Sequence, residues 1–185
     1  MATATRTEVV DVDINKLYDV IVDYAHTPES FEKVFKEVRP LVKGRMIGVF
    51  GSAGRRDIEK RSAQGRVAGE YCDIVVVTEE DDRDINGQEI LEQIAEGAIE
   101  KGKTKDLDLF LVHDREKAVQ KAVDMARPGD MILLLGKGHE KSILYNGPKA
   151  SDYRNRPQDD TDPERVLKRD YDEVSVVREA IRARE

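Results

Sequence analysis

The chain has 185 residues, of which 37% are charged and 39% hydrophobic, and its formal net charge at pH 7 is −7. This length suits one domain with a substantial core. The acidic balance argues against general affinity for nucleic acid, because neutralising phosphates requires a basic face. The one cysteine, Cys72, excludes an internal disulfide. No apolar stretch reaches the roughly 20 residues of a membrane helix, and we expect a cytoplasmic protein.

Apolar runs and helical spacing alternate along the first 136 residues. The apolar runs predict an edge strand over 8–11 and further strands over 19–23, 46–50, 74–77, 107–112 and up to Gly136. Helical spacing predicts helices from Pro28 to Gly44 and over 58–71, 88–101 and 115–126. Strands that alternate with helices across short turns are typical of a mostly parallel, doubly wound α/β sheet flanked by helices.

The tail has a different pattern. A further strand is predicted over 141–145, with a turn at 146–147, and the charged, proline-containing segment over 148–168 predicts a mobile loop or insertion. Three apolar residues at helical spacing predict a closing helix: Val174, Val177 and Ile181. We therefore expect a lead-in over 1–15, the main domain over 16–147, a charged insertion over 148–169 and the closing helix over 170–185.

Four of the predicted strands end in polar loops, which share one edge of the sheet if the strands are parallel. The first loop is Asp23–Pro28, in which Thr27 can cap the next helix. Asp23 can accept hydrogen bonds from two hydroxyl groups, as an acid does from a ribose. The alternative is that Asp23 and His26 only organise the turn.

The second and third loops carry opposite charges. Glycines before a helix in 51–57 suit an anion, which Arg55 and Arg56 can bind, although the loop is neither a Walker A motif nor GxGxxG. In the third loop, 79–84, four successive acids favour a cationic ligand group and Arg83 an anionic one. The alternative for the second loop is that its arginines are only solvated. The alternative for the third loop is that its acids only cap a helix and face solvent.

The fourth loop is Gly136-Lys137-Gly138-His139-Glu140. Here Lys137 is a candidate phosphate binder, His139 a candidate base and Glu140 a candidate partner for an ammonium group. A single histidine is usually structural, but three such groups at one glycine-flanked strand end indicate a binding site. No histidine or cysteine cluster has zinc spacing, and no nucleophile elbow occurs in the sequence.

Taken in this order, the motifs resemble the C-terminal domain of the Mur ligase family, and within it the members that add the third residue of the peptidoglycan stem. The resemblance runs from about Arg6 to Gly147 and resumes near Tyr171. The motifs that carry it are residues 22–28 (VDYAHTP), Val49-Phe50-Gly51 with Gly54, Arg56 and Asp57, Val77-Thr78 followed by Arg83, and Gly136 to Glu140.

The resemblance implies a Rossmann-like domain of an ATP-dependent ligase in the cytoplasm. In this family a UDP-binding domain and a P-loop ATPase domain provide most contacts to ATP and Mg²⁺. The ligase activates the carboxylate of UDP-MurNAc-L-Ala-D-Glu as an acyl phosphate, which the amine of a diamino acid attacks. By similarity, Arg6, Asp23 and His26 contact ATP. The residues implied to hold the amino acid are Arg56, Glu80, Asp81, Asp82, Arg83, Gly136 and Glu140. No catalytic residue and no metal ligand is assigned.

The third loop departs from the family pattern. Diaminopimelate-adding members read Asp-Asn-Pro-Arg at this place, whereas this chain reads Glu80-Asp81-Asp82-Arg83. The arginine favours a distal carboxylate and the added acids a distal amine. Lysine and ornithine carry the distal amine, and diaminopimelate carries both groups. The loop therefore favours a diamino acid and leaves diaminopimelate, lysine and ornithine open.

A second departure is that the chain contains no Gly-Lys-Ser/Thr P-loop. We therefore expect a fragment of a longer ligase, or a domain that needs a partner, and we expect that it does not ligate by itself. A non-catalytic binding module is the first alternative. An unrelated Rossmann domain, such as a dehydrogenase, is the second, and the absence of GxGxxG counts against it.

Overall fold

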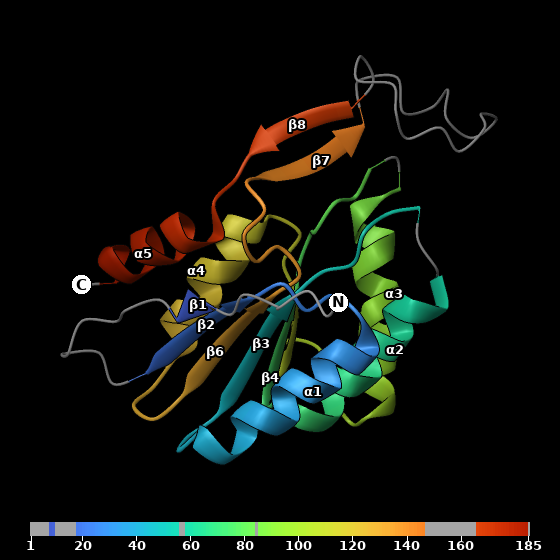
Figure 1. Ribbon diagram of the computed structural model, residues 1–185. Coiled ribbons are helices and arrows are strands. Elements are labelled where there is room, and N and C mark those ends of the chain that lie inside the picture. The colour runs from blue at the N-terminus through green and yellow to red at the C-terminus, as the bar shows by residue number, and fades with distance from the viewer. Residues whose placement is uncertain (1–7, 10–17, 56–57, 84, 147–165, 185) are drawn as a thin grey trace, which may run out of the picture.

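The computed structural model describes residues 8–9, 18–55, 58–83, 85–146 and 166–184 (Figure 1). The lead-in over 1–15, apart from residues 8 and 9, lies outside these ranges. So do Arg6, Arg56 and most of the charged segment that follows residue 146. The site predictions for these two arginines therefore stay predictions.

A six-stranded sheet forms the middle of the described structure, and all its strands are parallel except the first (Figure 1). In spatial order the strands are β1 (Glu8–Val9), β2 (Asp19–Asp23), β6 (Met131–Leu135), β3 (Met46–Phe50), β4 (Ile74–Val77) and β5 (Leu109–Leu111). Every residue of β3, β4 and β6 is buried. Strands buried on both faces account for continuous apolar runs rather than alternating ones.

Helices cover both faces of this sheet (Figure 1). One face packs against α1 (Pro28–Val38), α2 (Ile58–Tyr71) and α3 (Gly87–Glu100), and the other against α4 (Arg115–Met125) and α5 (Glu173–Ala183). Phe31 and Phe35 of α1 fill the first core, and Val177 and Ile181 of α5 belong to the second. This arrangement confirms the predicted doubly wound α/β fold. None of the described helices is both long and apolar enough to cross a membrane.

A two-stranded antiparallel hairpin lies beyond the carboxyl edge of the sheet and consists of β7 (Ser142–Asn146) and β8 (Val166–Asp170). It is joined to the loop after β4, because the backbone N–H of Arg83 donates to the carbonyl of Leu144 at 3.2 Å. Residues 166–168, which composition placed in a mobile loop, form the start of β8. That part of the prediction is wrong, since cross-strand pairing can order a charged segment that has no apolar periodicity.

Two further boundaries differ from the prediction. The first helix ends at Val38 and continues as a 3₁₀ turn over Arg39–Leu41, because Pro40 lacks the N–H that an α-helix needs. Strand β5 is shorter than 107–112 because the carbonyl of Thr104 accepts the N–H groups of residues 107, 108 and 109, which closes a turn there. Cys72 is buried beside Gly48, and burial raises the pKa of its thiol, which agrees with a packing role.

Candidate functional site

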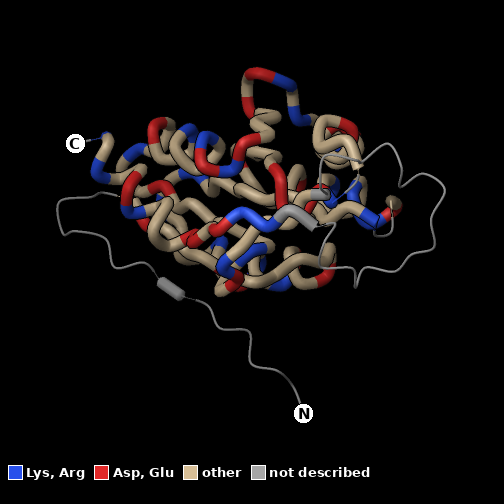
Figure 2. Tube along the Cα trace, turned by 90° about the horizontal axis from the view of Figure 1, so that it is seen from above, with Lys and Arg blue, Asp and Glu red and all other residues tan. Residues whose placement is uncertain are grey.

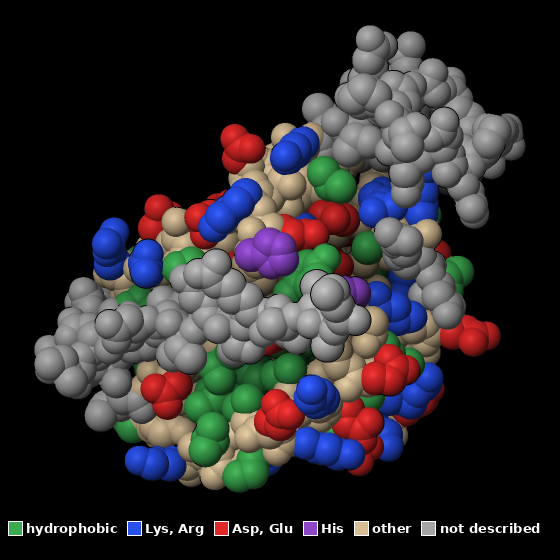
Figure 3. Space-filling model, in the orientation of Figure 1, with side chains coloured by type: hydrophobic (Ala, Val, Ile, Leu, Met, Phe, Trp, Pro, Cys, Tyr) green, Lys and Arg blue, Asp and Glu red, His purple; other side chains and the backbone are tan. Residues whose placement is uncertain are grey.

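A cavity of about 350 Å³ lies at the carboxyl edge of the sheet, where the loops after β2, β3, β4 and β6 meet. Its lining residues are Tyr24, His26, Thr27, Ala53, Lys60, Glu80, Asp81, Arg83, Gly136 and Glu140. Histidine, acidic and hydrophobic side chains gather near the middle of the face that Figure 3 shows. The four polar loops therefore converge, as expected for strand ends of an open α/β sheet.

The loop after β2 is held by the cap of α1. Thr27 and Ser30 form a reciprocal capping box, in which the hydroxyl of Thr27 accepts the N–H of Ser30 at 3.1 Å. The side-chain amide of Gln64 in α2 donates to the carbonyl of His26 at 3.0 Å. These bonds place His26 in the cavity wall. Asp23 is buried at the end of β2, and its Oδ1 accepts the N–H of Ala25 at 2.7 Å.

Three rings cluster at the mouth of the cavity. The ring of Tyr24 lies 4.9 Å from that of His26 and 5.0 Å from that of His139, centroid to centroid. The Tyr24 hydroxyl donates to Oε1 of Glu140 at 3.5 Å. Burial and then the charge of Glu140 raise the pKa of the Tyr24 phenol, while the nearby ammonium of Lys137 lowers it. Tyr24 is therefore a neutral donor that faces Glu140 at neutral pH.

Glu80 is a buried carboxyl group in the cavity wall. Its Oε2 has no hydrogen-bond partner among the described residues. Burial raises the pKa of Glu80 to about 7, although the positive charges of Arg115, Lys60 and Lys137 oppose the shift. A carboxyl group that titrates near neutral pH and lacks a partner suits an incoming hydrogen-bond donor or cation.

Lys137 and two carboxylates form a network beside the cavity. The Lys137 ammonium donates to Oδ1 of Asp81 at 2.9 Å and lies 2.8 Å from Oε2 of Glu140. Oδ1 of Asp81 also accepts the backbone N–H of Leu144 at 2.9 Å. Asp81 and Glu140 thus share one buried cation, which neutralises part of the acidic charge in this wall.

The loop after β4 is also held by residues of the β7–β8 hairpin and of α4. Glu79 is buried, and its carboxylate accepts from Arg169 of β8 at 2.8 Å, from the hydroxyl of Tyr145 in β7, and from the backbone N–H of Arg115 at 3.2 Å. Arg83 has a φ of 55°, in the left-handed region that side chains rarely adopt. The hairpin therefore holds the loop in a conformation that directs Arg83 to the cavity.

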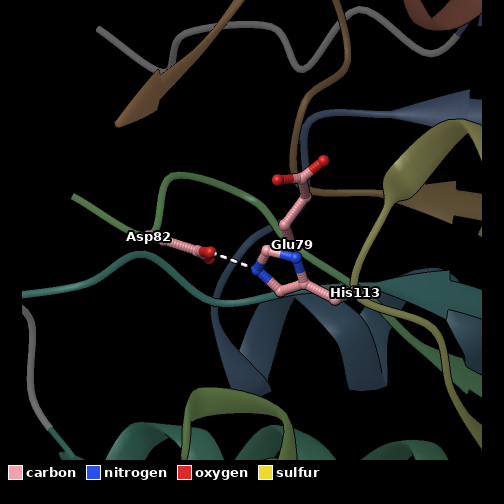
Figure 4. A group of neighbouring side chains, drawn as sticks. All are labelled: Glu79, Asp82 and His113. Atoms are coloured by element: carbon pink, nitrogen blue, oxygen red, sulfur yellow. Dashed lines mark hydrogen bonds and ion pairs between the residues drawn. The ribbon is translucent and has the colours of Figure 1, made fainter. Parts of the chain in front are cut away.

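Asp82 is not among the residues that line the cavity, and its carboxylate pairs with Nε2 of His113 (Figure 4). Glu79, Asp82 and His113 can each offer one ligand atom, and these atoms lie within 4.8 Å of one another. However, both oxygens of Glu79 already accept from Arg169 or Tyr145. Because a guanidinium occupies Glu79, we interpret the group as a structural cluster and not as a metal centre.

The structure brings together six of the ten predicted site residues, namely His26, Glu80, Asp81, Arg83, Gly136 and Glu140. Asp23 lies at the adjacent end of β2, and Asp82 points to His113 instead. Sequence reasoning missed four lining residues: Tyr24, Thr27, Ala53 and Lys60. Tyr24 and Thr27 lie inside the first polar loop, and Lys60 is in the first turn of α2. Their positions next to the recognised motifs could have identified them as cavity residues.

Acidic and basic residues are interspersed along the trace in Figure 2. This distribution is in keeping with the formal net charge of −7.

Comparison with known proteins decides the family. Residues 5–138 match the profile described as "Mur ligase, glutamate ligase domain", which is more than half of the chain. The chain belongs to the Mur ligase family. Its fold agrees with this, because a structure titled UDP-N-acetylmuramoyl-L-alanyl-D-glutamate–2,6-diaminopimelate ligase superposes with a TM-score of 0.77 at 26% identity. That comparison covers 99% of this chain and 32% of the other.

Curated relatives of this Mur ligase domain are named as ligases. The UDP-N-acetylmuramyl-tripeptide synthetase of Roseiflexus sp. (strain RS-1) is 50% identical over 134 residues, which are 72% of this chain and 26% of the relative. The UDP-N-acetylmuramoyl-L-alanyl-D-glutamate–2,6-diaminopimelate ligase of Aquifex aeolicus (strain VF5) is 45% identical over 144 residues, or 78% of this chain and 28% of the relative. The chain thus spans about a quarter of the length of these relatives.

Proposed function

We propose that this domain contacts the amino acid and ATP in an ATP-dependent ligase, which adds a diamino acid (diaminopimelate or lysine) to UDP-MurNAc-L-Ala-D-Glu in peptidoglycan synthesis. The names of the relatives from Roseiflexus sp. and Aquifex aeolicus support this reaction. The observation that carries the proposal is the cavity at the strand ends, in which Glu80 and Glu140 share the wall with Arg83. An amino acid offers both an ammonium group and a carboxylate, and this wall offers a partner for each.

The amino-acid contacts follow from the charges in the wall. Glu80 and Glu140 suit an ammonium group, and Arg83 suits a carboxylate through its two-pronged guanidinium. Gly136, with a φ of 102°, approaches Glu80 so closely that a Cβ atom there would lie 3.0 Å from Oε2, and a side chain would therefore crowd the cavity wall. Arg56, Asp81 and Asp82 complete the proposed set by family resemblance. In the structure Asp81 pairs with Lys137 and Asp82 with His113.

ATP supplies the phosphoryl group that activates the substrate carboxylate in the proposed reaction, and phosphate leaves as the amide bond forms. In this domain Asp23 fits a ribose, because a buried carboxylate at a strand end can accept hydroxyl hydrogen bonds. His26 lies in the same loop and faces the cavity. Arg6 is the third proposed contact. Mg²⁺ is assigned to no residue of this chain.

An alternative is a non-catalytic module that binds the amino acid without ligating it. The cavity residues described here all lie in this one domain, so they support binding of an amino acid by the module as well as by the ligase. The two functions differ in what happens when the UDP-binding and ATPase domains of a relative are supplied in trans. Ligation under those conditions supports the ligase, and its absence supports the binding module.

A direct test is calorimetry with L-lysine, L-ornithine and meso-diaminopimelate. We expect at least one of them to bind, and to raise the melting temperature of the chain. Glu80→Gln should weaken binding, while Glu96→Ala, an exposed position of α3, should not. The absence of binding by all three amino acids would contradict the proposal. We also expect no ligation by the chain alone with UDP-MurNAc-L-Ala-D-Glu, ATP and Mg²⁺, and turnover would refute that expectation.

A further inference from the structure

Lys137 links two walls of the cavity. Its side chain is 1% exposed, and its ammonium lies between Asp81, which follows β4, and Glu140, which follows β6. Both carboxylates line the cavity. An ammonium group has three donors and no acceptor, so a buried lysine requires partners of this kind. One buried cation therefore joins two loops that are distant in the sequence.

The two carboxylates differ in what else they contact. Oδ1 of Asp81 accepts from both Lys137 and the backbone of Leu144, and its side chain is 12% exposed. The Glu140 side chain is 37% exposed, and within the described part of the chain its other oxygen, Oε1, accepts the long hydrogen bond from Tyr24. Asp81 is thus anchored to the hairpin, while Glu140 remains accessible from the cavity.

We propose that Lys137 is a positioning residue of the amino-acid pocket, which holds Glu140 toward the ligand by tying it to the anchored Asp81. The identity of the ligand, an amino acid with a free ammonium group, rests on the proposed function. The role of Asp81 changes accordingly. It is the counterion of Lys137 and the link to β7, and Glu140 is the carboxylate that meets the ligand.

The phenol of Tyr24 reports where Glu140 lies, because the charge of Glu140 and their hydrogen bond both raise the pKa of the phenol. The phenol is titrated by NMR with ¹³C-labelled tyrosine, and Tyr24→Phe assigns the signal among the six tyrosines. We expect Glu140→Gln to lower the Tyr24 pKa in the unchanged chain. In a chain that carries Lys137→Met it should have no effect, because Glu140 is then no longer held. An equal effect in both backgrounds would overturn the proposal.

A second measurement separates positioning from simple charge neutralisation. Lys137→Met leaves Asp81 without its cation, which destabilises the fold and can prevent folding. Lys137→Met combined with Asp81→Asn removes both charges, and the Tyr24 titration is repeated in that background. We expect this double variant to recover the melting temperature but to bind L-lysine and meso-diaminopimelate at least about tenfold more weakly than the unchanged chain. If the double variant also recovers binding, Lys137 only neutralises the charge of Asp81 and does not position Glu140, which would overturn the proposal.

Lys141→Met is the matched control, since Lys141 is 64% exposed and pairs with Asp172 away from the cavity. It should leave both the Tyr24 titration and the binding unchanged. If the unchanged chain binds none of L-lysine, L-ornithine and meso-diaminopimelate, the proposed function fails. The dependence of the Tyr24 pKa on Glu140 in the two backgrounds still decides the role of Lys137, so the two failures are distinguishable.

Discussion

The backbone of Gly136 packs directly against the carboxylate of Glu80, so that a Cβ atom at position 136 would lie 3.0 Å from Oε2. Gly136 also has a φ of 102°, which side chains rarely adopt. The residue therefore meets two requirements at once: a left-handed backbone at the end of β6 and a close approach to Glu80 that leaves no room for a side chain.

We predict that Gly136→Ala lowers the free energy of unfolding by about 1–3 kcal/mol, because of backbone strain, and also abolishes amino-acid binding. Gly102→Ala is the matched control, since Gly102 has a φ of 90° but no atom within 4 Å of its Cβ position. The control should show the strain without the loss of binding. Chemical denaturation and calorimetry give the two quantities. Normal binding by Gly136→Ala would show that the space beside Glu80 is not used.

The raised pKa of Glu80 predicts a pH-dependent stability. Burial lifts this pKa from about 4.5 in the unfolded chain to about 7, so the folded state binds the proton more tightly. The resulting stability is fully present below about pH 4.5 and is lost as the pH rises through about 7. At about 1.4 kcal/mol per pKa unit, the loss is on the order of 3 kcal/mol.

Glu80→Gln removes this dependence. We expect urea denaturation to show the substituted chain as more stable than the unchanged chain at about pH 8, and the two to be similar at about pH 5. The difference between the two chains isolates Glu80 from the other titrating groups. A constant difference across this pH range would mean that Glu80 titrates normally.

Whereas the stability contributed by Glu80 falls as the pH rises, the affinity for the ligand should increase as the pH rises. An ammonium group pairs with the charged form of Glu80, which must lose its proton first. We therefore predict that affinity for L-lysine falls by up to about tenfold per pH unit below pH 7. In Glu80→Gln the affinity should be weak at every pH. Calorimetry at several pH values tests this, and a pH-independent affinity in the unchanged chain would exclude Glu80 as the ammonium partner.

The sheet could be predicted from the sequence because strands buried on both faces appear as continuous apolar runs, such as Met131–Leu135. The place of the cavity followed, since parallel strands bring their carboxyl ends to one edge. The partners inside the site could not be predicted in this way. Asp81 and Lys137 are 56 residues apart, and their pairing depends on the three-dimensional packing of two loops. Similarly, Glu79 is held outside the cavity by Tyr145 and Arg169 of the hairpin, which are 66 and 90 residues further along the chain.

Helices α2 and α3 approach closely at Gly65. A Cβ atom there would lie 1.9 Å from the carbonyl oxygen of Ile94. Alanine raises helix propensity by about 1 kcal/mol over glycine, but here the clash with backbone outweighs that gain. We predict that Gly65→Ala lowers the melting temperature, whereas Glu96→Ala on the exposed face of α3 does not. Circular dichroism measures both, and an increase in melting temperature for Gly65→Ala would show that the helices can separate without cost.

Arg115 and Glu173 form an ion pair in which both side chains are fully buried, with a shortest distance of 2.8 Å. The same guanidinium donates to the carbonyls of Glu79 and Leu135, at the ends of β4 and β6. The hydroxyl of Tyr171 adds a hydrogen bond to Glu173 at 2.8 Å. This network ties α4 and α5 to β4 and β6, two of the four strands whose loops build the cavity.

Arg115→Met should therefore lower the free energy of unfolding by about 3–5 kcal/mol, because it leaves the Glu173 carboxylate buried without its cation. Lys117→Met is the matched control on the same helix, since Lys117 is 78% exposed and should show no measurable change. If the loss comes from the uncompensated charge, Arg115→Met combined with Glu173→Gln should recover part of the stability. A double variant no more stable than Arg115→Met would instead assign the loss to the carbonyl contacts of Arg115 at the strand ends.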